Sequence, residues 1–513
     1  MATIVNSIGL RGIEGYLVQI EVQIVPGKEG ISIVGLPDLS VKESKDRVLG
    51  ALASQDCELP EKRIIINLSP AEQKKNSPIF DLGMAIGMMR EVHHFSYKIP
   101  NDAAFLGVLS LDGSIKPVDG MLPAIMAARE EQIKTLYLPH IHDLPIQEID
   151  GMELRFVTHI NEVIESFSGQ TTLFTHTSSK FTPQESTEYT PVYSKDFKDI
   201  IGHKHAKRAF EIAAAGGHNI LMSGPPGCGK SLLAETFPSI LPPLTNKERF
   251  EVISIYQLAR EKNDSYQISP FRAPHHSSSA ISLIGGGTHP KPGEVSLAHN
   301  GVLFLDEMAE FPKRTLDMLR QPLESGKVTI SRAASTATYP SRFILVGAMN
   351  PCPCGYLGAH NKYCTCTSKQ VIAYQNRISG PMKDRFDLLL TLQSVSLAKE
   401  GVEQRQCSAE IRKRVVEARD RQYKRYGDGI CNGNAPNELF LECTPLTSSQ
   451  RQMMQQWSSK EQFSNRVQMK IHRLARTISD LQGQDELTNE SLWEAVNFRR
   501  HQLRDIQKVQ VNV

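Results

Sequence analysis

The pattern of hydrophobic and polar positions changes three times along the chain. In residues 1–168, strands that alternate apolar and polar positions, such as YLVQIEVQIV (16–25), are interspersed with helical stretches such as LPAIMAAREEQI (122–133). This pattern predicts an α/β domain. Residues 169–195 are rich in Thr, Ser and Pro and lack periodicity, which is typical of a linker.

Residues 196–393 alternate short apolar runs, such as GVLFLDE (301–307), with helical segments. This alternation is typical of a parallel sheet with crossover helices. From residue 394 to 513 the pattern is helical, for example in VQMKIHRLARTISDL (467–481). We therefore predict a second α/β domain followed by a helical C-terminal domain.

Composition and charge are those of a water-soluble globular chain. Of the 513 residues 40% are hydrophobic and 22% are charged, and the formal net charge is +2. No apolar run approaches the ~18–20 residues of a membrane span. The start, MATIVNSIGLRGIEG, has no basic segment before an apolar core, so we read no signal peptide. We expect a cytoplasmic protein with no membrane partner and with reduced cysteines.

Four of the nine cysteines cluster in the segment 352–366, where C-P-C and C-T-C flank nine residues. In a reducing compartment such a cluster indicates metal ligands rather than disulfides. Four thiolates satisfy a tetrahedral Zn²⁺ and leave no open position, so we predict a structural zinc site. Unliganded thiols, another metal and a redox pair remain alternatives, because the spacing differs from the usual C-x₂-C. The predicted ligands are Cys352, Cys354, Cys364 and Cys366.

The segment GPPGCGKS (224–231) fits the phosphate-binding pattern G-x-x-x-x-G-K-[ST] and lies between an apolar run and a helical run. In this pattern glycines let backbone N–H groups surround phosphates, Lys230 reaches the β- and γ-phosphates, and the Ser231 hydroxyl binds Mg²⁺. The start of the following helix adds its positive end. The residues predicted to contact ATP here are Gly224, Pro225, Pro226, Gly227, Cys228, Gly229, Lys230, Ser231 and Leu232.

An acidic pair agrees with this motif. Asp306 and Glu307 follow an apolar run that is typical of a buried strand, and Asp306 lies 76 positions after Lys230. At this place Asp306 is expected to hold Mg²⁺ and Glu307 to activate the attacking water. The chain is therefore predicted to be an ATPase with ATP and Mg²⁺ as ligands.

Longer stretches narrow the class further. They are FRAPHHSSSA (271–280), LIGGGTHPKPGEVSLAHNGVLFLDEMAEF (283–311), LRQPLE (319–324), NPCPCG (350–355) and ISGPMKDRFD (378–387). Together with GPPGCGKS they resemble the magnesium-chelatase-like group of AAA+ ATPases, and within it the ComM/YifB-type proteins. The resemblance covers nearly the whole chain.

This resemblance implies roles for residues outside the two motifs. Asn350 would be the sensor that positions water against the γ-phosphate. Arg385 would be an arginine finger offered to the ATP of the neighbouring subunit in a homohexameric ring. Arg466 would be a second sensor that reaches the phosphates from the helical lid. Ile201 and Gly202 would lie beside the adenine.

Two segments, 265–293 and 325–383, contain no Asp or Glu. The resemblance places them in insertions that face the central pore of a ring. Lys and Arg without nearby carboxylates suit a polyphosphate backbone, because each neutralised phosphate releases counterions. A buried strand inside the second segment also explains part of the missing acidity. The predicted DNA contacts are Arg272, Lys291, Lys327, Arg332, Arg342, Lys362, Tyr363 and Lys369.

The roles of the tyrosines and histidines in these segments can be interpreted in two ways. Tyrosines there could stack on bases or pack internally; they are Tyr339, Tyr356, Tyr363 and Tyr374. His275 and His276 invite a metal or catalytic role, but adjacent residues do not readily face one ion. We therefore favour loop or packing roles for both histidines.

Residues 66–87 and 106–128 resemble the proteolytic domain of Lon-type proteases, which implies a ribosomal S5 domain 2-like fold. Where that family places its nucleophilic serine, this chain has Ile79-Phe80-Asp81, and where it places the lysine base, this chain has Met121-Leu122-Pro123-Ala124. A serine needs an adjacent base to attack, so we predict a domain without the catalytic dyad. Whether it assists ring assembly or guides DNA stays open.

The combined hypothesis is an ATP-dependent hexameric DNA motor. By resemblance it would be a branch migration helicase that acts in homologous recombination and natural transformation. Its partners would be single-stranded, duplex or branched DNA, with recombination proteins in addition. The alternatives are a magnesium-chelatase motor subunit that serves metal insertion into a porphyrin, and a nucleotide-switched DNA clamp.

Overall fold

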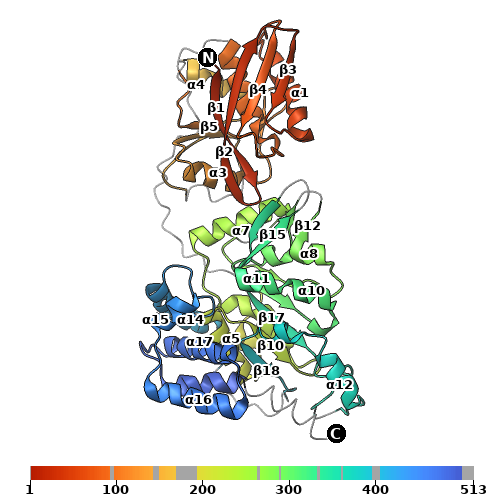
Figure 1. Cartoon of the computed structure of the whole chain (residues 1–513), viewed down its shortest axis with the longest axis vertical. Coiled ribbons are helices and arrows are strands. Elements are labelled where there is room, and N and C mark those ends of the chain that lie inside the picture. Colours follow the sequence, from red (N-terminus) through yellow and green to blue (C-terminus); the bar gives the residue numbers. More distant parts are fainter. Residues whose placement is uncertain are drawn as a thin grey trace.

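The computed structural model describes residues 2–92, 98–141, 149–168, 193–262, 266–287, 290–331, 336–359, 362–395 and 405–499. Figure 1 shows the N-terminal domain at one end of the long axis, the second α/β domain in the middle, and the C-terminal helices beside that domain. The predicted α/β character, the parallel sheet and the helical C-terminal part are confirmed. Within the described residues, no helix is both long and apolar enough to cross a membrane. Most of the predicted linker lies outside the described residues.

The N-terminal domain is built on a seven-stranded mixed sheet in the order β3-β4-β2-β1-β5-β8-β9. Its strands are β1 (Thr3–Arg11), β2 (Glu14–Val25), β3 (Gly30–Val34), β4 (Arg63–Ser69), β5 (Ala103–Phe105), β8 (Thr135–Leu138) and β9 (Glu153–Phe156), with a small hairpin of β6 (Val108–Leu109) and β7 (Ile115–Lys116). Its helices are α1 (Leu39–Ala53), η1 (Pro78–Phe80), α2 (Asp81–Val92), α3 (Met121–Glu130) and α4 (Ile160–Ser168). The alternating pattern of β2 buries one face of the strand against the domain core.

The positions of the missing protease dyad are filled by packing residues. Ile79 and Met121 are buried in the domain core. Asp81 is buried as well, and its carboxylate is paired with Arg47 at 2.8 Å and accepts the backbone N–H of Leu109 at 3.4 Å. These side chains hold the domain together and supply no nucleophile with an adjacent base.

The second domain contains a five-stranded, fully parallel sheet in the order β11-β14-β17-β10-β18. The strands of this sheet are β10 (Ile220–Ser223), β11 (Phe271–Arg272), β14 (Gly301–Leu305), β17 (Phe343–Met349) and β18 (Leu388–Thr391). Two small antiparallel pairs are added, β12 (Gly285–Gly286) with β13 (Lys291–Pro292) and β15 (Lys327–Ser331) with β16 (Thr336–Pro340).

Helices surround this sheet. They are η3 (Phe197–Asp199), α5 (Lys204–Gly216), α6 (Lys230–Thr236), η4 (Phe237–Ile240), α7 (Asn246–Ala259), α8 (Ala280–Ile284), α9 (Glu294–Leu297), η5 (Met308–Glu310), α10 (Lys313–Met318), α11 (Arg320–Ser325), α12 (Ser368–Gln375) and α13 (Gly380–Lys383). Because all five strands run in one direction, their carboxyl ends meet at one edge of the sheet. Ligands of open α/β sheets bind at this edge.

Helix α7 joins the two α/β domains. Its residues Phe250 and Ile253 are buried in the core of the N-terminal domain. Polar contacts accompany this packing, since the N–H of Leu122 donates to Gln257 Oε1 at 3.1 Å and Arg260 pairs with Asp119 at 2.6 Å. Burial of two large apolar side chains contributes about 2 kcal/mol each, so the domains are held by a shared core.

The C-terminal helical domain, which the resemblance predicts to be the lid, consists of α14 (Ser408–Tyr426), α15 (Asn437–Cys443), α16 (Ser448–Glu461), α17 (Asn465–Leu481) and a helical segment at 489–499. It contacts the residues directly before β18, an edge strand of the five-stranded sheet. Lys470 of α17 contacts Asp387 at 2.8 Å and the carbonyl oxygen of Phe386 at 3.0 Å, directly before β18. The start of α17 is therefore placed at the sheet edge opposite the carboxyl ends.

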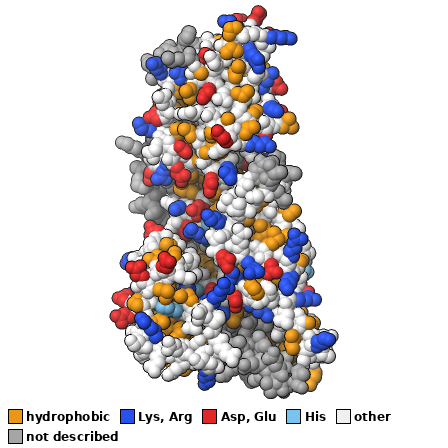
Figure 2. Space-filling model, viewed as in Figure 1, with side chains coloured by type: hydrophobic (Ala, Val, Ile, Leu, Met, Phe, Trp, Pro, Cys, Tyr) orange, Lys and Arg blue, Asp and Glu red, His pale blue; other side chains and the backbone are white. Residues whose placement is uncertain are grey.

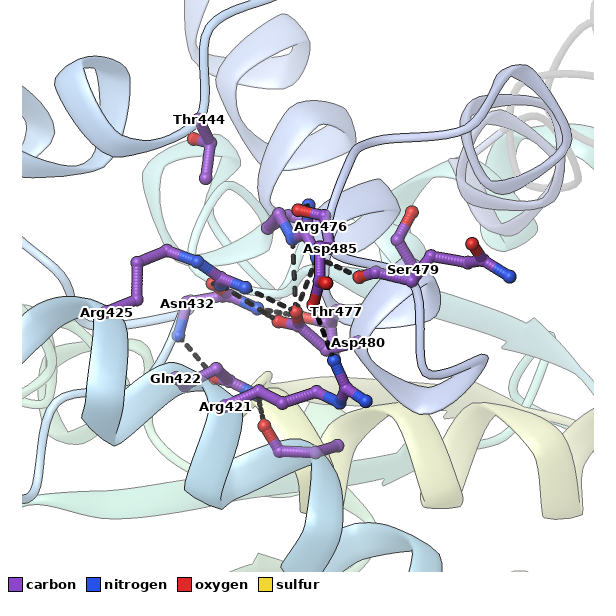
Figure 3. A network of polar contacts seen from close by, with 12 residues as sticks. Arg421, Gln422, Arg425, Asn432, Thr444, Arg476, Thr477, Ser479, Asp480 and Asp485 are labelled. Atoms are coloured by element: carbon purple, nitrogen blue, oxygen red, sulfur yellow. Dashed lines mark hydrogen bonds and ion pairs between the residues drawn. The ribbon is translucent and has the colours of Figure 1, made fainter.

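A buried ion network fastens α14 to α17 (Figure 3). The carboxylate of Asp480 accepts hydrogen bonds from Arg425 at 2.6 Å, from Arg476 at 2.7 Å and from Asn432 at 2.8 Å. The Asp480 side chain is fully buried. A buried carboxylate of this kind is stable only because cationic and amide donors surround it.

Replacing Asp480 with alanine is expected to destabilise the lid by about 3–5 kcal/mol, because it leaves two buried guanidinium groups without their carboxylate. The two tryptophans of the chain, Trp457 and Trp493, pack edge to face in the lid, so urea unfolding followed by tryptophan fluorescence reports on this domain. The matched control is Asp485→Ala, which removes an exposed partner of Arg421 and is expected to have little effect. Equal shifts in both variants would contradict the prediction.

Candidate functional site

The predicted phosphate-binding loop connects β10 to α6 at the carboxyl edge of the sheet. β10 ends at Ser223 and α6 begins at Lys230. Gly227 and Gly229 have φ of +76° and +88°, a left-handed conformation that other residues adopt only with strain. The loop therefore needs glycine at these positions to turn its N–H groups toward a phosphate.

Lys230 points back over this loop. Its ammonium donates to the carbonyl oxygens of Gly224 at 2.6 Å and Pro225 at 3.1 Å, and to Asn350 Oδ1 at 3.1 Å. Burial lowers the pKa of Lys230, while Cys228, Asp306 and Glu307 act in the opposite direction. The contact with Asn350 brings the predicted sensor and the predicted phosphate ligand into one site.

The predicted Mg²⁺ ligands also meet. The Ser231 hydroxyl donates to Asp306 Oδ2 at 3.0 Å, and the N–H of Glu307 donates to Asp306 Oδ1 at 2.8 Å. A hydroxyl and a carboxylate are the oxygen ligands that Mg²⁺ prefers, with phosphate and water completing its shell. The residues present therefore fit the metal.

The segment that contains Ile201 and Gly202 lies beside the loop. A Cβ placed on Gly229 would be 3.8 Å from His203 Nε2, so the two segments are in contact. This location is compatible with the predicted place of the adenine, which stays a prediction.

Arg385 and Arg466 belong to a different cluster. Arg385 forms an ion pair with Glu324, and its side chain is 14% exposed. Burial lowers the pKa of Arg385, and the nearby guanidinium groups of Arg466 and Arg320 lower it further. The sequence motifs predicted no role for Arg320, although this residue lies in the stretch LRQPLE (319–324).

This arginine cluster is remote from the phosphate-binding loop of the same chain. Arg385 lies three residues before β18, whereas the loop follows β10, and the two strands are parallel neighbours in which Ile220 pairs with Leu388 and Ser223 with Thr391. Four residues of strand rise by about 13 Å. The cluster and the loop are thus at opposite edges of one sheet.

The four clustered cysteines converge as predicted. The Sγ atoms of Cys352, Cys354 and Cys364 are 3.3, 3.7 and 3.6 Å apart, and all four cysteines, Cys366 included, place their sulfur atoms within 4.8 Å of one another. These distances are too long for a disulfide and close to the ~3.8 Å edge of a tetrahedron with ~2.3 Å zinc–sulfur bonds. The cluster is compatible with a zinc site.

The cysteine loop packs against the phosphate-binding loop. Gly355 has φ of +82°, and a Cβ placed there would be 2.8 Å from Pro226 Cδ. On the other side, Gln375 of α12 donates to the carbonyl oxygen of Pro351 at 3.2 Å. The cysteine loop therefore follows Asn350 and contacts the phosphate-binding loop at Pro226.

The residues predicted to contact DNA fall into three groups. Lys291, Lys327, Arg342, Lys362, Tyr363 and Lys369 are exposed, and Tyr363 is 92% exposed. Arg332 lies outside the described residues. Arg272 is bound by Glu294 at 2.6 Å and Glu261 at 3.0 Å. Because two carboxylates neutralise this guanidinium, the geometry argues against a DNA contact for Arg272.

The four tyrosines of these segments differ in their burial. Tyr339 and Tyr374 are buried, and burial raises the pKa of each to about 12. The Tyr339 hydroxyl donates to the carbonyl oxygen of Pro290 at 2.7 Å. These two rings pack internally and do not stack on bases. Tyr356 is covered by Lys362, whose ammonium is 4.6 Å from the ring centre, which leaves Tyr363 as the tyrosine of this set that is open to a base.

Sequence reasoning missed one contact at the nucleotide site. His276 Nδ1 lies 3.3 Å from Glu307 Oε2, the carboxylate predicted to activate water. The available signal was the stretch FRAPHH, in which the second histidine follows the strand β11 by four residues. A strand of two residues is too short to be read from a hydrophobic pattern.

A phosphate-binding loop, an acidic pair and an asparagine at the ends of neighbouring parallel strands define a P-loop nucleotide-binding protein of the AAA+ class. Family models identify the branch of this class. The model described as magnesium chelatase, subunit ChlI, matches residues 196–400, the model for subunit ChlI of Mg-chelatase matches 20–142, and its C-terminal model matches 405–499.

Whole-length relatives agree with these models. Competence protein ComM of Haemophilus influenzae is 38% identical over 502 residues, and uncharacterized protein YifB of Escherichia coli is 36% identical over 502 residues; each alignment covers 97% of both chains. The chain belongs to the ComM/YifB-type magnesium-chelatase-like family, as the sequence motifs predicted. Part of the chain is also similar to Lon protease 2 of Bacillus subtilis, at 29% identity over 182 residues. The family is related to AAA+ ATPases, which supports ATP and Mg²⁺ as ligands.

Proposed function

We propose that this protein is an ATP-driven DNA motor that works as a closed homohexameric ring and drives branch migration in homologous recombination and natural transformation. The observation that carries the proposal is the separation of Arg385 from Lys230 by one strand length of the sheet. In a head-to-tail ring, two different surfaces of the same chain meet at each interface. The side of one subunit that carries Arg385 can therefore meet the side of the next subunit that carries Lys230. Each nucleotide site is then completed by a neighbour.

Each residue of the site has a defined task in this proposal. Lys230 and the loop N–H groups bind the β- and γ-phosphates, Ser231 and Asp306 hold Mg²⁺, and Glu307 takes the proton of the attacking water. Bound Mg²⁺ neutralises charge that develops on the phosphate oxygens. The Asn350 amide, which is already 3.1 Å from Lys230, orients the water. Arg385 of the adjacent subunit stabilises the transition state.

Arg466 is assigned to the same neighbouring site as Arg385. The start of α17 is anchored to the segment directly before β18, so Arg466 lies with Arg385 and not with its own Lys230. Both guanidinium groups would then approach the phosphates of the next subunit together.

Three features support DNA as the substrate. The segments 265–293 and 325–383 contain no carboxylate, and the exposed Lys291 and Lys327 belong to them. Figure 2 shows Lys and Arg interspersed with Asp and Glu over much of one face. A whole-length relative is named a competence protein, which is consistent with the proposed role in natural transformation.

We also propose that the cysteine cluster holds a structural Zn²⁺. Four thiolates close its coordination, so the ion has no open position for catalysis. Its task would be to stiffen the loop that contacts Pro226 and carries Lys362 and Tyr363, because this loop has no apolar core of its own.

The deciding experiment is steady-state ATP hydrolysis with and without single-stranded, duplex and four-way-junction DNA. We expect DNA to raise the rate, and the DNA affinity to fall about 10³-fold between 50 and 200 mM salt if the ring neutralises about six phosphates. Lys230→Ala is the control that removes hydrolysis. A rate that is indifferent to every DNA but rises with a tetrapyrrole-binding partner would favour the metal-chelatase alternative, which the ChlI family models suggest.

A further inference from the structure

The backbone around Arg385 is bound on one side to the second α/β domain. Asn219, the residue directly before β10, donates its side-chain amide to the carbonyl oxygen of Arg385 at 3.0 Å, and its backbone N–H donates to Asp387 Oδ2 at 3.0 Å. The side-chain oxygen of Asn219 accepts the N–H of Leu345 in β17 at 2.8 Å. Asn219 thus ties the backbone of the predicted arginine finger to two central strands of the sheet.

On the other side, two cations of the lid meet at the next peptide group. The carbonyl oxygen of Phe386 accepts hydrogen bonds from Lys470 Nζ at 3.0 Å and from Arg499 Nη1 at 2.7 Å. Lys470 belongs to α17, and Arg499 belongs to the helical segment 489–499. Two separate helices of the lid therefore converge on the carbonyl group that directly follows the predicted finger.

Both cations are largely withdrawn from water. Arg499 is 6% exposed, and its guanidinium group also reaches the carbonyl oxygen of Asp387 at 3.4 Å. The ammonium group of Lys470 is 2.8 Å from Asp387 Oδ1, and these two side chains are 18% and 15% exposed. A buried cation is stable only where hydrogen-bond acceptors surround it. Here the residues next to Arg385 supply those acceptors, so the lid and this segment hold each other in place.

The same contacts place Arg466 next to Arg385. Lys470 follows Arg466 by four positions on α17, so both side chains lie on one face of the helix. Burial lowers the pKa of Arg385, and the positive charge of Arg466 lowers it further, which indicates that the two guanidinium groups are close. Like charges repel each other, and the hydrogen bonds to the Phe386 carbonyl oppose their separation.

We propose that Arg499 and Lys470 are positioning residues for the arginine finger, because their hydrogen bonds to the Phe386 carbonyl fix the direction in which Arg385 points toward the neighbour's phosphate. A misplacement of about 1 Å at a reacting group can lower a rate about 100-fold. The nucleotide site of the same chain is at the opposite edge of the sheet and does not include these contacts. This inference rests on the proposed ring, in which the finger acts on a neighbour.

The test uses Arg499→Met in the full-length chain, which keeps an apolar side chain and removes the hydrogen-bond donor. We expect kcat for ATP hydrolysis to fall about 10–100-fold, the range for loss of a hydrogen bond from a charged group. Binding of a fluorescent ATP analogue should be unchanged, which also verifies that the variant is folded. Lys470→Met is expected to act in the same direction, and Arg499→Lys, which keeps a donor, is expected to restore most of the rate.

A double-mutant cycle separates positioning from a general loss of structure. In an Arg385→Ala background the finger is already absent, so the addition of Arg499→Met is expected to leave the residual kcat unchanged. A fall by the same factor in both backgrounds would overturn the inference. An unchanged kcat of Arg499→Met in the otherwise wild-type chain would overturn it as well.

Arg419→Met is the matched control, because Arg419 of α14 also donates from the lid to a carbonyl group of the second domain, that of Ala214, at 2.7 Å. We expect its kcat to equal that of the wild type. An equal loss of activity in Arg419→Met and Arg499→Met would show that any weakening of lid attachment lowers the rate, and the inference would then be wrong.

Mixed rings distinguish a failure of this inference from a failure of the proposed ring. Arg499→Met subunits should regain activity when mixed with Glu307→Gln subunits, which supply a correctly placed finger, and should stay inactive when mixed with Arg385→Ala subunits. Recovery in neither mixture, while Arg385→Ala and Glu307→Gln subunits do rescue each other, contradicts the inference alone. If that last pair also fails, the finger does not act in trans and the proposed ring is wrong, while the double-mutant cycle still decides whether Arg499 acts through Arg385.

Discussion

Replacing Arg385 with alanine is expected to lower the rate of ATP hydrolysis by about 10³–10⁵-fold, the range for loss of an arginine finger. The reason is the charge that develops on the phosphate oxygens in the transition state. Arg385 is paired with Glu324 within its own chain, and in a ring the guanidinium would exchange this carboxylate for the neighbour's phosphate. Nucleotide binding should persist, because Lys230 and Ser231 are untouched.

Mixed rings test whether Arg385 acts on a neighbour. Neither Arg385→Ala nor Glu307→Gln subunits are expected to hydrolyse ATP at an appreciable rate alone. In mixtures, some interfaces combine an intact Arg385 with an intact Glu307, and activity is expected to return. Arg377→Ala is the matched control, since Arg377 is exposed and pairs with Glu310. Absence of recovery at every mixing ratio would exclude action in trans.

Cys352→Ser is expected to abolish zinc binding. Cys352 is the buried member of the cluster, and structural zinc sites contribute about 10–16 kcal/mol of binding free energy that depends on all ligands being present. Elemental analysis should find about one zinc ion per wild-type chain and none in the variant. DNA affinity should fall as well, because the loop that carries Lys362 and Tyr363 loses its fixed shape.

The control for this experiment is Cys443→Ser, which changes an exposed cysteine outside the cluster. It should leave zinc content and DNA affinity as in the wild type. Zinc content and DNA affinity that are unchanged in Cys352→Ser would show that the cluster has no role as a metal site.

Local patterns were sufficient for the longer strands and helices and for the phosphate-binding motif. β14 and β17 are predicted by their apolar runs, and the phosphate-binding loop is predicted by the spacing of its glycines, Lys230 and Ser231. The cysteine cluster was also predictable, because its four cysteines lie within 15 consecutive residues. Motifs made of a few neighbouring residues can be recognised in a sequence, because few backbone conformations are compatible with them.

Other conclusions depended on contacts between distant segments. The number of charged residues in a segment could not reveal that Arg272 is neutralised by Glu294, and the sequence could not reveal that Tyr339 is buried. Both depend on contacts between segments of the second domain that are distant in the sequence. The domain interface on α7 is of the same kind, because Phe250 and Ile253 read as core residues of either domain.

By itself the sequence determined the family, the nucleotide-binding motif and the cluster of four cysteines, since each is carried by residues close together in the chain. Only the tertiary structure decided that Arg385 lies at the sheet edge opposite Lys230 and that His276 contacts Glu307. The physical reason is the parallel sheet. Its register and strand direction determine which distant residues meet and which are separated, and neither can be read from the local pattern of hydrophobic and polar residues.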